Sequence, residues 1–192
     1  MTKEEIIKIA EGIDGWMARS ELSVLYDLVY GLIKKGDHAV EVGSWKGRSA
    51  FVFASVCKEK GAKLTCIDTF TGSQISLSGY KEALDMGATA FFNSNIKKNL
   101  AGLPVDYIIE NSLTAHRHIK NSSLVFCFID GDHTEPVVNQ DIENYWPKVK
   151  EGGVYAGHDY NMGWPAVVMA VDDKCPDPNK FELFGSTWVI RK

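Results

Sequence analysis

The sequence predicts an α/β protein whose sheet is doubly wound and mostly parallel, with an antiparallel strand at the C-terminal end and helices on both faces. From residue 38 onward, short apolar runs alternate with segments of helical period. The run at 124–130 (LVFCFID) is apolar up to its final acid, as in a central parallel strand covered by helices on both faces. Polar residues end several apolar runs, so we expect them to gather at one edge of the sheet.

Two helices are expected before the first strand. Thr2 and Glu5 have the spacing of a capping box that begins the first helix. A second helix starts near Ser20, because the apolar residues after it keep a helical period: Leu22, Leu25, Leu28, Val29, Leu32 and Ile33. Gly36, after two lysines, ends it. We therefore expect one domain over residues 1–192, with residues 1–36 forming a helical cap.

The remaining elements follow from the same patterns. Strands are expected at 38–42, 63–68, 106–110, 124–130 and 153–157, and helices at 46–60, 136–146 and 165–173. Two short strands are expected around Gly185 within 181–191. The stretch from Phe70 to Ala88 is rich in Ser, Gly and Thr and has little periodicity, which favours a loop. Such a loop is either a lid over the site or a surface insertion.

Composition narrows the class of partner. The net charge of −4 comes without a basic face, which argues against nucleic acid as a partner. Cys57, Cys66, Cys127 and Cys175 form no C-x-x-C pair, so we expect buried free thiols in a reducing compartment. Because the sequence shows neither a secretory signal nor a membrane-spanning apolar run, we expect a cytoplasmic protein without a membrane partner.

The run at 40–49 (VEVGSWKGRS) carries the clearest functional signal. It predicts a strand that ends in an acid and a glycine, followed by a tight loop and a helix opened by Gly47. Such a loop directs backbone N–H groups and a helix N-terminus at a bound small molecule. Its G-x-x-x-G-x-S spacing differs from dinucleotide and triphosphate patterns. Asp68, at the end of the next strand, suits ribose hydroxyls, the alternative being a helix N-cap.

An ordered set of motifs resembles the class I S-adenosylmethionine-dependent methyltransferases, which have a Rossmann-like fold. The segments are E-x-G-x-x-x-G-x-S at 41–49, CIDTF at 66–70, FIDGDH at 128–133, the stretch 141–153 and GHDY at 157–160. They look like the methyltransferase-24 branch, which is related to small-molecule O-methyltransferases of the catechol and macrolide-sugar types. Gly15-Trp16-Met17 with Glu21 and the closing WVIR at 188–191 also fit that branch.

The resemblance implies S-adenosylmethionine (SAM) as cofactor. The residues implied in binding it are Glu41, Gly43, Ser44, Gly47, Ser49, Asp68, Thr69, Phe70, Ser112 and Asp130. Ser44 and Gly47 would donate to the methionine carboxylate, and Glu41 would hold the ammonium group. Asp68 would bind the ribose, whereas Thr69 or Phe70 would border the adenine. Asn111 and Ser112 would face the adenine edge.

Catalytic and metal-binding candidates lie after the last two parallel strands. Asp130, His133 and His158 are the expected catalytic residues, with His133 placed to remove a proton from a hydroxyl or to cap a helix. Asp130, His158 and Asp159 are the expected ligands of a divalent metal ion, since metal-dependent relatives carry acids at these places. The imidazole shifts preference from Mg²⁺ towards transition metals or Zn²⁺. Alternatively, Asp159 caps a turn and His158 contacts the substrate.

The function expected is methyl transfer from SAM to a small-molecule acceptor, at a hydroxyl oxygen. A phosphatase of the haloacid dehalogenase type is an alternative, because residues 130–134 match D-x-D-x-T, but that motif belongs after the first strand. A non-catalytic SAM-binding module is a second alternative. A nicotinamide dehydrogenase is disfavoured because G-x-G-x-x-G is missing. A homodimer is the assembly expected of such enzymes.

Overall fold

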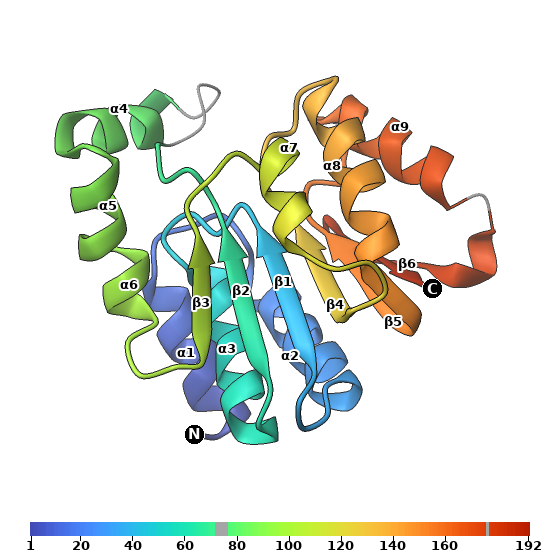
Figure 1. The fold of residues 1–192 in the computed structure, drawn as a ribbon, viewed down its shortest axis with the longest axis horizontal. Coiled ribbons are helices and arrows are strands. Elements are labelled where there is room, and N and C mark those ends of the chain that lie inside the picture. The colour runs from blue at the N-terminus through green and yellow to red at the C-terminus, as the bar shows by residue number, and fades with distance from the viewer. Residues whose placement is uncertain (72–76, 176) are drawn as a thin grey trace.

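The computed structural model describes residues 1–71, 77–175 and 177–192, with the backbone alone at 77–80. A seven-stranded sheet forms its centre (Figure 1). The strands lie in the order β3-β2-β1-β4-β5-β7-β6. Their bounds are β1 (His38–Val42), β2 (Lys63–Ile67), β3 (Val105–Ile108), β4 (Leu124–Ile129), β5 (Val149–Gly157), β6 (Phe181–Phe184) and β7 (Thr187–Arg191).

The strand directions confirm the expected fold class. Strands β1 to β5 pair in parallel, whereas β7 runs antiparallel to β5 and β6 antiparallel to β7. The antiparallel part is a hairpin of the two short strands that were expected around Gly185. From β1 the chain builds outward to β2 and β3, then crosses back to place β4 on the other side of β1. The order reverses between β1 and β4, and ligands of such sheets bind at this switch point, beyond the carboxyl ends of the strands.

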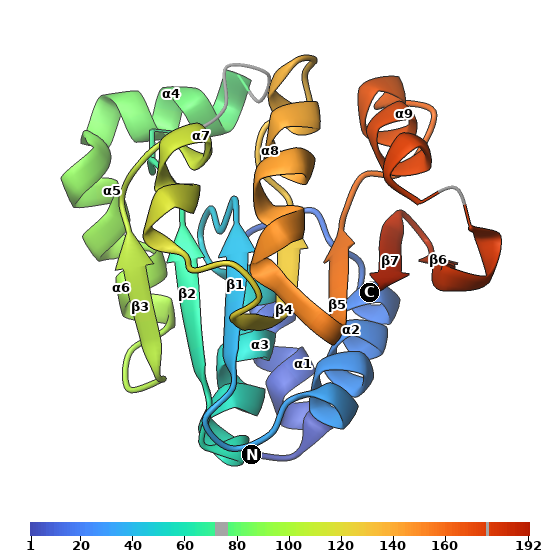
Figure 2. The ribbon, with the colours of Figure 1, turned by 45° about the vertical axis from the view of Figure 1, so that its right-hand side comes forward.

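Helices cover both faces of the sheet (Figure 2). One face carries α1 (Lys3–Gly12), α2 (Arg19–Leu32) and α3 (Arg48–Lys60), and the other carries α7 (Ser112–Ala115), α8 (Val137–Tyr145) and α9 (Pro165–Lys174). Alternation along β4 serves both layers, since Phe126 and Phe128 pack with the first group and Cys127 and Ile129 with the second. This double burial explains why β4 is apolar throughout.

The first two helices belong to the main core. The capping box is present, with the Glu5 N–H donating to Thr2 Oγ1 over 3.3 Å and the Thr2 N–H to Glu5 Oε2 over 2.8 Å. Ile6 from α1 and Leu22 and Leu25 from α2 are buried in the same cluster as Phe126 of β4. Helices α1 and α2 therefore both pack on α3, and α2 also contacts β4 of the sheet directly.

The expected loop over residues 70–88 is wrong in its second half. There the chain forms α4 (Leu77–Met86), followed by α5 (Ala88–Ser94) and α6 (Ile96–Asn99), which run beside the β3 edge (Figure 1). Helix α4 carries Ser78 and Gly79 near its start, two residues that disfavour a helix, yet Ala83 is buried. Residues 72–76, the part of the expected lid nearest β2, lie outside the described residues.

The observed ends of some helices and strands differ slightly from those expected from the sequence. Strand β5 begins at Val149, not at 153, because Val149 already pairs with Leu124 across an irregularity in the β4 ladder. The described residues also form three short 3₁₀ turns: His116–His118, Trp146–Lys148 and Pro178–Lys180. Within the described residues, none of the helices has the length and apolar character needed to cross a bilayer.

Candidate active site

The glycine loop after β1 lies directly against the loop after β4. Gly43 has a φ of 84°, and a Cβ added to it would come within 2.1 Å of the Asp130 carbonyl oxygen. Only glycine permits so close a backbone approach. Gly47, with a φ of 93°, is the N-cap of α3. The loop and Asp130 therefore meet at the switch point of the sheet.

Residues with a strained, left-handed backbone lie at the same edge of the sheet. Among the described residues, four that are not glycine have positive φ, and three of them follow strands there: Trp45 after β1, Phe70 after β2 and Asp159 after β5. Left-handed backbone is costly for bulky side chains, and such residues cluster at functional sites. The strain thus marks the carboxyl ends of β1, β2 and β5 as the functional edge.

Glu41 is a fully buried carboxylate in β1, just before the loop. Its Oε1 accepts a hydrogen bond from Ser49 Oγ over 2.6 Å. Glu41 Oε2 and the buried Ser44 Oγ have no hydrogen-bond partner within the described part of the chain. Burial, with smaller contributions from Asp130 and Asp68, raises the pKa of Glu41 to about 8. Buried polar atoms without partners are rare, and these two suit the charged methionine end of SAM.

Asp68 joins the glycine loop to the turn after β2. Its Oδ2 accepts from the Trp45 N–H over 2.8 Å, and its Oδ1 accepts from the Phe70 N–H over 2.7 Å. Burial raises the pKa of Asp68 although these N–H groups oppose the shift. This structural role was not expected from the sequence, and ribose binding stays a prediction beside it. The Phe70 ring is buried against Phe92, whereas Thr69 Oγ1 lies 2.8 Å from Thr71 Oγ1.

Ser112 starts α7 on the far side of the sheet edge, where its carbonyl accepts from Tyr145 over 3.0 Å. Asn111 caps this helix by accepting from the Leu113 N–H.

Asp141 of α8 is fully buried, and neither of its carboxylate oxygens has a hydrogen-bond partner among the described residues. A Cβ on Gly131 would lie 3.7 Å from Asp141 Oδ2. Burial raises the pKa of Asp141 to about 7.

Sequence reasoning assigned no role to Asp141. A signal existed, because the buried positions of α8 are Val138, Asp141, Ile142 and Tyr145. That spacing is the i, i+3, i+4, i+7 stripe of a core-facing helix, and it could have indicated that an acid within the stripe is buried.

Two carboxylates and two imidazoles form a polar centre after β4 and β5, comprising Asp130, His133, His158 and Asp159. His133 Nε2 lies 3.4 Å from Asp130 Oδ1 and 3.1 Å from Asp159 Oδ2. His158 Nδ1 lies 3.4 Å from Asp159 Oδ2 and 3.9 Å from Asp130 Oδ1. The sequence predicted these four residues at one edge, and the structure brings them together.

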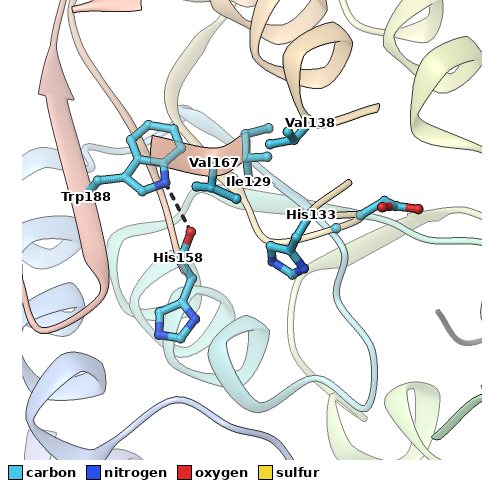
Figure 3. Close-up of a pocket in the computed structure, with 8 residues that line it drawn as sticks. Ile129, His133, Val138, His158, Val167 and Trp188 are labelled. Carbon is cyan, nitrogen blue, oxygen red and sulfur yellow. Dashed lines mark hydrogen bonds between the residues drawn. The ribbon is translucent and has the colours of Figure 1, made fainter. Parts of the chain in front are cut away.

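Apolar side chains back the polar centre (Figure 3). Ile129, Val138 and Val167 line the small pocket beside His133 and His158. The Trp188 indole Nε1 donates to the His158 carbonyl over 3.2 Å, and the Trp164 ring lies 4.9 Å from the His133 ring. This surrounding lowers the local dielectric and strengthens the ionic contacts.

The pKa values in the centre follow from these contacts. Burial alone would lower the pKa of His133, but its bonds to Asp130 and Asp159 raise it to about 9. The pKa of His158 likewise rises to about 10, against burial, through Asp159 and Glu21. The two imidazoles in turn lower the pKa of Asp159, although burial opposes this.

The centre has the chemistry of a cation site. One ligand atom each from Asp130, His133 and Asp159 lies within 4.8 Å of the others. The sequence predicted His158 as the nitrogen ligand, whereas the structure groups His133 with the two carboxylates; His158 Nδ1 faces the same carboxylates from 3.4 and 3.9 Å. Mixed carboxylate and imidazole ligands suit Zn²⁺ or a transition metal better than Mg²⁺.

Comparisons with known proteins agree with the fold. A family model described as a methyltransferase domain, methyltransferase-24, matches residues 40–160. A protein from Corynebacterium glutamicum is similar in structure, with 15% identity, a TM-score of 0.65, and coverage of 98% of this chain and 89% of that one. CalS11, a TDP-rhamnose 3′-O-methyltransferase of calicheamicin biosynthesis, shows 17% identity and a TM-score of 0.60, covering 98% and 92%. The methyltransferase PaMTH1 of Podospora anserina, solved with S-adenosylhomocysteine, shows 12% identity and a TM-score of 0.63, covering 98% and 86%.

Proposed function

Because this chain belongs to the methyltransferase-24 family and is a SAM-dependent methyltransferase, we propose that it methylates a hydroxyl oxygen of a small molecule. The observation that carries the proposal is the contact between Gly43 and the Asp130 carbonyl oxygen. It places the unpartnered polar atoms of Glu41 and Ser44 on one side of the switch point and the polar centre on the other. The glycine loop proposed to bind the cofactor therefore lies next to the polar centre, whose side chains can accept or donate a proton.

Cofactor binding is assigned to the loops after β1, β2 and β3. Glu41 would pair with the ammonium group of SAM, and Ser44 with Gly47 would meet its carboxylate at the start of α3. Ser49 would keep Glu41 in place through the 2.6 Å bond. Asp68 would accept the ribose hydroxyls on lone pairs that the backbone leaves free, and Ser112 would face the adenine.

SAM, when bound, supplies a methyl group on a sulfonium, so the protein has chiefly to align the acceptor. Bond formation between the acceptor oxygen and that methyl carbon would break the carbon–sulfur bond and release S-adenosylhomocysteine. The hydroxyl proton passes to His133 or His158 when that imidazole is neutral. Because contacts with carboxylates raise both pKa values, we expect methyl transfer to become faster as the pH rises. Asp130 and Asp159 hold both imidazoles in place.

A divalent cation at Asp130, His133 and Asp159 forms the second part of the proposal. When bound there, it would favour ionisation of the acceptor hydroxyl. The test is calorimetric titration with Zn²⁺, Mn²⁺ and Mg²⁺, comparing the wild type with H133A. Binding that H133A abolishes supports the site, and equal binding by both proteins removes His133 from it.

Titration with S-adenosylhomocysteine tests the cofactor site. Asp68→Ala is a poor probe here, because it would also release the N–H groups of Trp45 and Phe70. Changing the ligand avoids this problem, so we compare S-adenosylhomocysteine with its 2′-deoxy counterpart. We expect micromolar binding, weakened roughly tenfold when the hydroxyl is lost. Lack of binding by S-adenosylhomocysteine would overturn the assignment of the pocket.

The acceptor class needs a separate assay. Transfer of labelled methyl from SAM is measured on a panel of phenols, sugars and hydroxy acids, with structured RNA as the competing class. The net charge of −4 favours the small molecules. Methylation of RNA with no turnover of any hydroxyl compound would contradict the proposal.

A further inference from the structure

The Glu21 carboxylate, in the first turn of α2, is buried beside the polar centre, far along the chain from its other members. Its Oε2 accepts from the Ala18 N–H over 2.9 Å, which caps the helix. Its Oε1 accepts from the Ser186 N–H over 2.8 Å, from His158 Nε2 over 3.2 Å and from Thr187 Oγ1 over 3.4 Å. One carboxylate therefore ties α2, the β6–β7 hairpin and the end of β5 together.

The hairpin turn is shaped around this carboxylate. Gly185 has a φ of 64°, and a Cβ added to it would lie 2.7 Å from Glu21 Oε1. Any other residue would have to push the carboxylate away from the turn. A side chain at this turn and the Glu21 carboxylate in its observed position therefore exclude each other.

The contact decides how the His158 ring faces the site. Glu21 engages Nε2, so Nδ1 is the nitrogen that points to Asp130 and Asp159. The backbone of His158 is held on both sides, its N–H by the Ile129 carbonyl over 3.1 Å and its carbonyl by the Trp188 indole. With the backbone fixed, the ring orientation depends on which partners its two nitrogens have.

We propose that Glu21 is a positioning residue of the active site: it fixes the His158 ring with Nε2 toward α2 and Nδ1 toward Asp130 and Asp159. Carboxylates that orient histidines in this way are a recurrent device in catalytic and metal sites. The first helices then contribute to the polar centre as well as to the core. The catalytic consequence rests on the proposed methyl transfer, whereas the ring orientation does not.

Ring-nitrogen NMR of ¹⁵N-labelled protein separates positioning from a purely structural role. His158 signals are assigned by their loss in H158Q. We expect a ring N–H at Nε2 that is protected from exchange in the wild type and lost in E21A. Thr187→Val is the matched control, because it removes another donor to Glu21 and leaves the His158 contact in place. Unchanged His158 signals in folded E21A, or an equal loss in T187V, would overturn the proposal.

Glu21→Gln keeps the test decisive if E21A fails to fold. Its amide oxygen can still accept from His158, but without charge it is the weaker acceptor. In His158 of the E21Q variant, we expect the Nε2 proton to be retained and its NMR signal to move upfield, and an unmoved signal would contradict the proposal.

Kinetics gives a second test once an acceptor is known. E21Q should then lower kcat roughly tenfold with the KM for SAM unchanged, and it should cause no further loss of kcat in an H158A background. Failure to find methyl transfer would leave the NMR result standing.

Discussion

Three carboxylates lie buried around the candidate site, and their hydrogen-bond partners decide the charge that each carries. Glu21 has four donors, and three of them, His158 and the N–H groups of Ala18 and Ser186, lower its pKa to about 2 although burial opposes the shift. Glu41 has one donor shown by geometry, and burial raises its pKa to about 8. Asp141 has none among the described residues, and burial raises its pKa to about 7. The hydrogen bonds of the Glu21 carboxylate are therefore satisfied within the protein, whereas Glu41 and Asp141 each keep carboxylate oxygens that could accept further hydrogen bonds.

At Glu41 this predicts pH-dependent cofactor affinity. A carboxyl with a pKa of about 8 keeps its proton near neutrality, and that proton must leave before Glu41 can pair with the cofactor ammonium. Affinity for S-adenosylhomocysteine should therefore rise with pH between about 6 and 8, by up to roughly tenfold per pH unit. Calorimetry across this range measures it.

Two controls isolate Glu41 in that experiment. 5′-Methylthioadenosine lacks the ammonium group, so its affinity should stay flat over the same range. Glu41→Gln should remove the pH slope for S-adenosylhomocysteine and leave methylthioadenosine binding unchanged. A slope that persists in E41Q would assign the titration to another group.

Asp141 gives a stability prediction of defined sign. Its folded pKa of about 7 lies above the ordinary value of about 4. Its contribution to stability is therefore full below about pH 4 and is lost as the pH rises to about 7. Asp141→Asn should match the wild type at low pH and exceed it by about 2–4 kcal/mol near pH 8. Urea unfolding at both pH values measures this, with the exposed Asp173→Asn as a control expected to change little.

At the scale of elements, the strands and the helices after them were predictable because each has its own hydrophobic period or begins and ends at residues such as glycine that mark its boundaries. Strand β1 and helix α3 fall within two residues of expectation, and Gly61 in left-handed conformation ends α3 as predicted. Helix α4 was missed because Ser78 and Gly79 near its start are poor helix formers and continue the Ser- and Gly-rich composition of the segment before it.

The candidate site was predictable where residues follow strands, and not where they come from helices. Asp68, Asp130 and Asp159 each end an apolar run, and the parallel topology brings them to one edge. Glu21 reaches the site only because α2 packs against the sheet face near the C-terminal hairpin. No local pattern encodes that tertiary contact, although the motif resemblance included the residue.

The loop after β1 allows a test of why its first glycine is required. Gly43 and Gly36 have similar φ values of 84° and 82°, but only Gly43 has backbone atoms where a Cβ would lie. Gly36→Ala should therefore cost about 1–2 kcal/mol for left-handed strain alone. Gly43→Ala should cost more than about 3 kcal/mol, because the β1 and β4 loops must separate. Urea unfolding measures the loss of unfolding free energy for both variants. Equal losses would show that the β1 and β4 loops can separate at little energetic cost.

At the scale of the whole molecule, the core extends beyond the family match. The match covers residues 40–160, yet the buried cluster runs from Ile6 to Val189. Helices α1 and α2 contribute fully buried side chains to it, and the β6–β7 hairpin closes the sheet next to β5. Both parts meet at Glu21, so the segments outside the match complete the core and border the polar centre.

This continuity predicts that residues 1–36 cannot be removed. Ile6, Ile7, Leu22, Leu25 and Val29 are buried almost completely. Each such side chain contributes about 1.5–3 kcal/mol, so their combined loss is comparable with the whole stability of an average domain, about 5–15 kcal/mol.

A fragment of residues 37–192 should therefore show no cooperative urea transition and bind no S-adenosylhomocysteine, while the full chain unfolds in one step. Leu25→Ala in the full chain is the milder comparison, expected to cost about 2–5 kcal/mol and to retain binding. A fragment that unfolds cooperatively would make the first two helices a separable cap. If that fragment also bound S-adenosylhomocysteine, the cofactor pocket would be independent of α2, and Glu21 would matter only for the chemistry at His158.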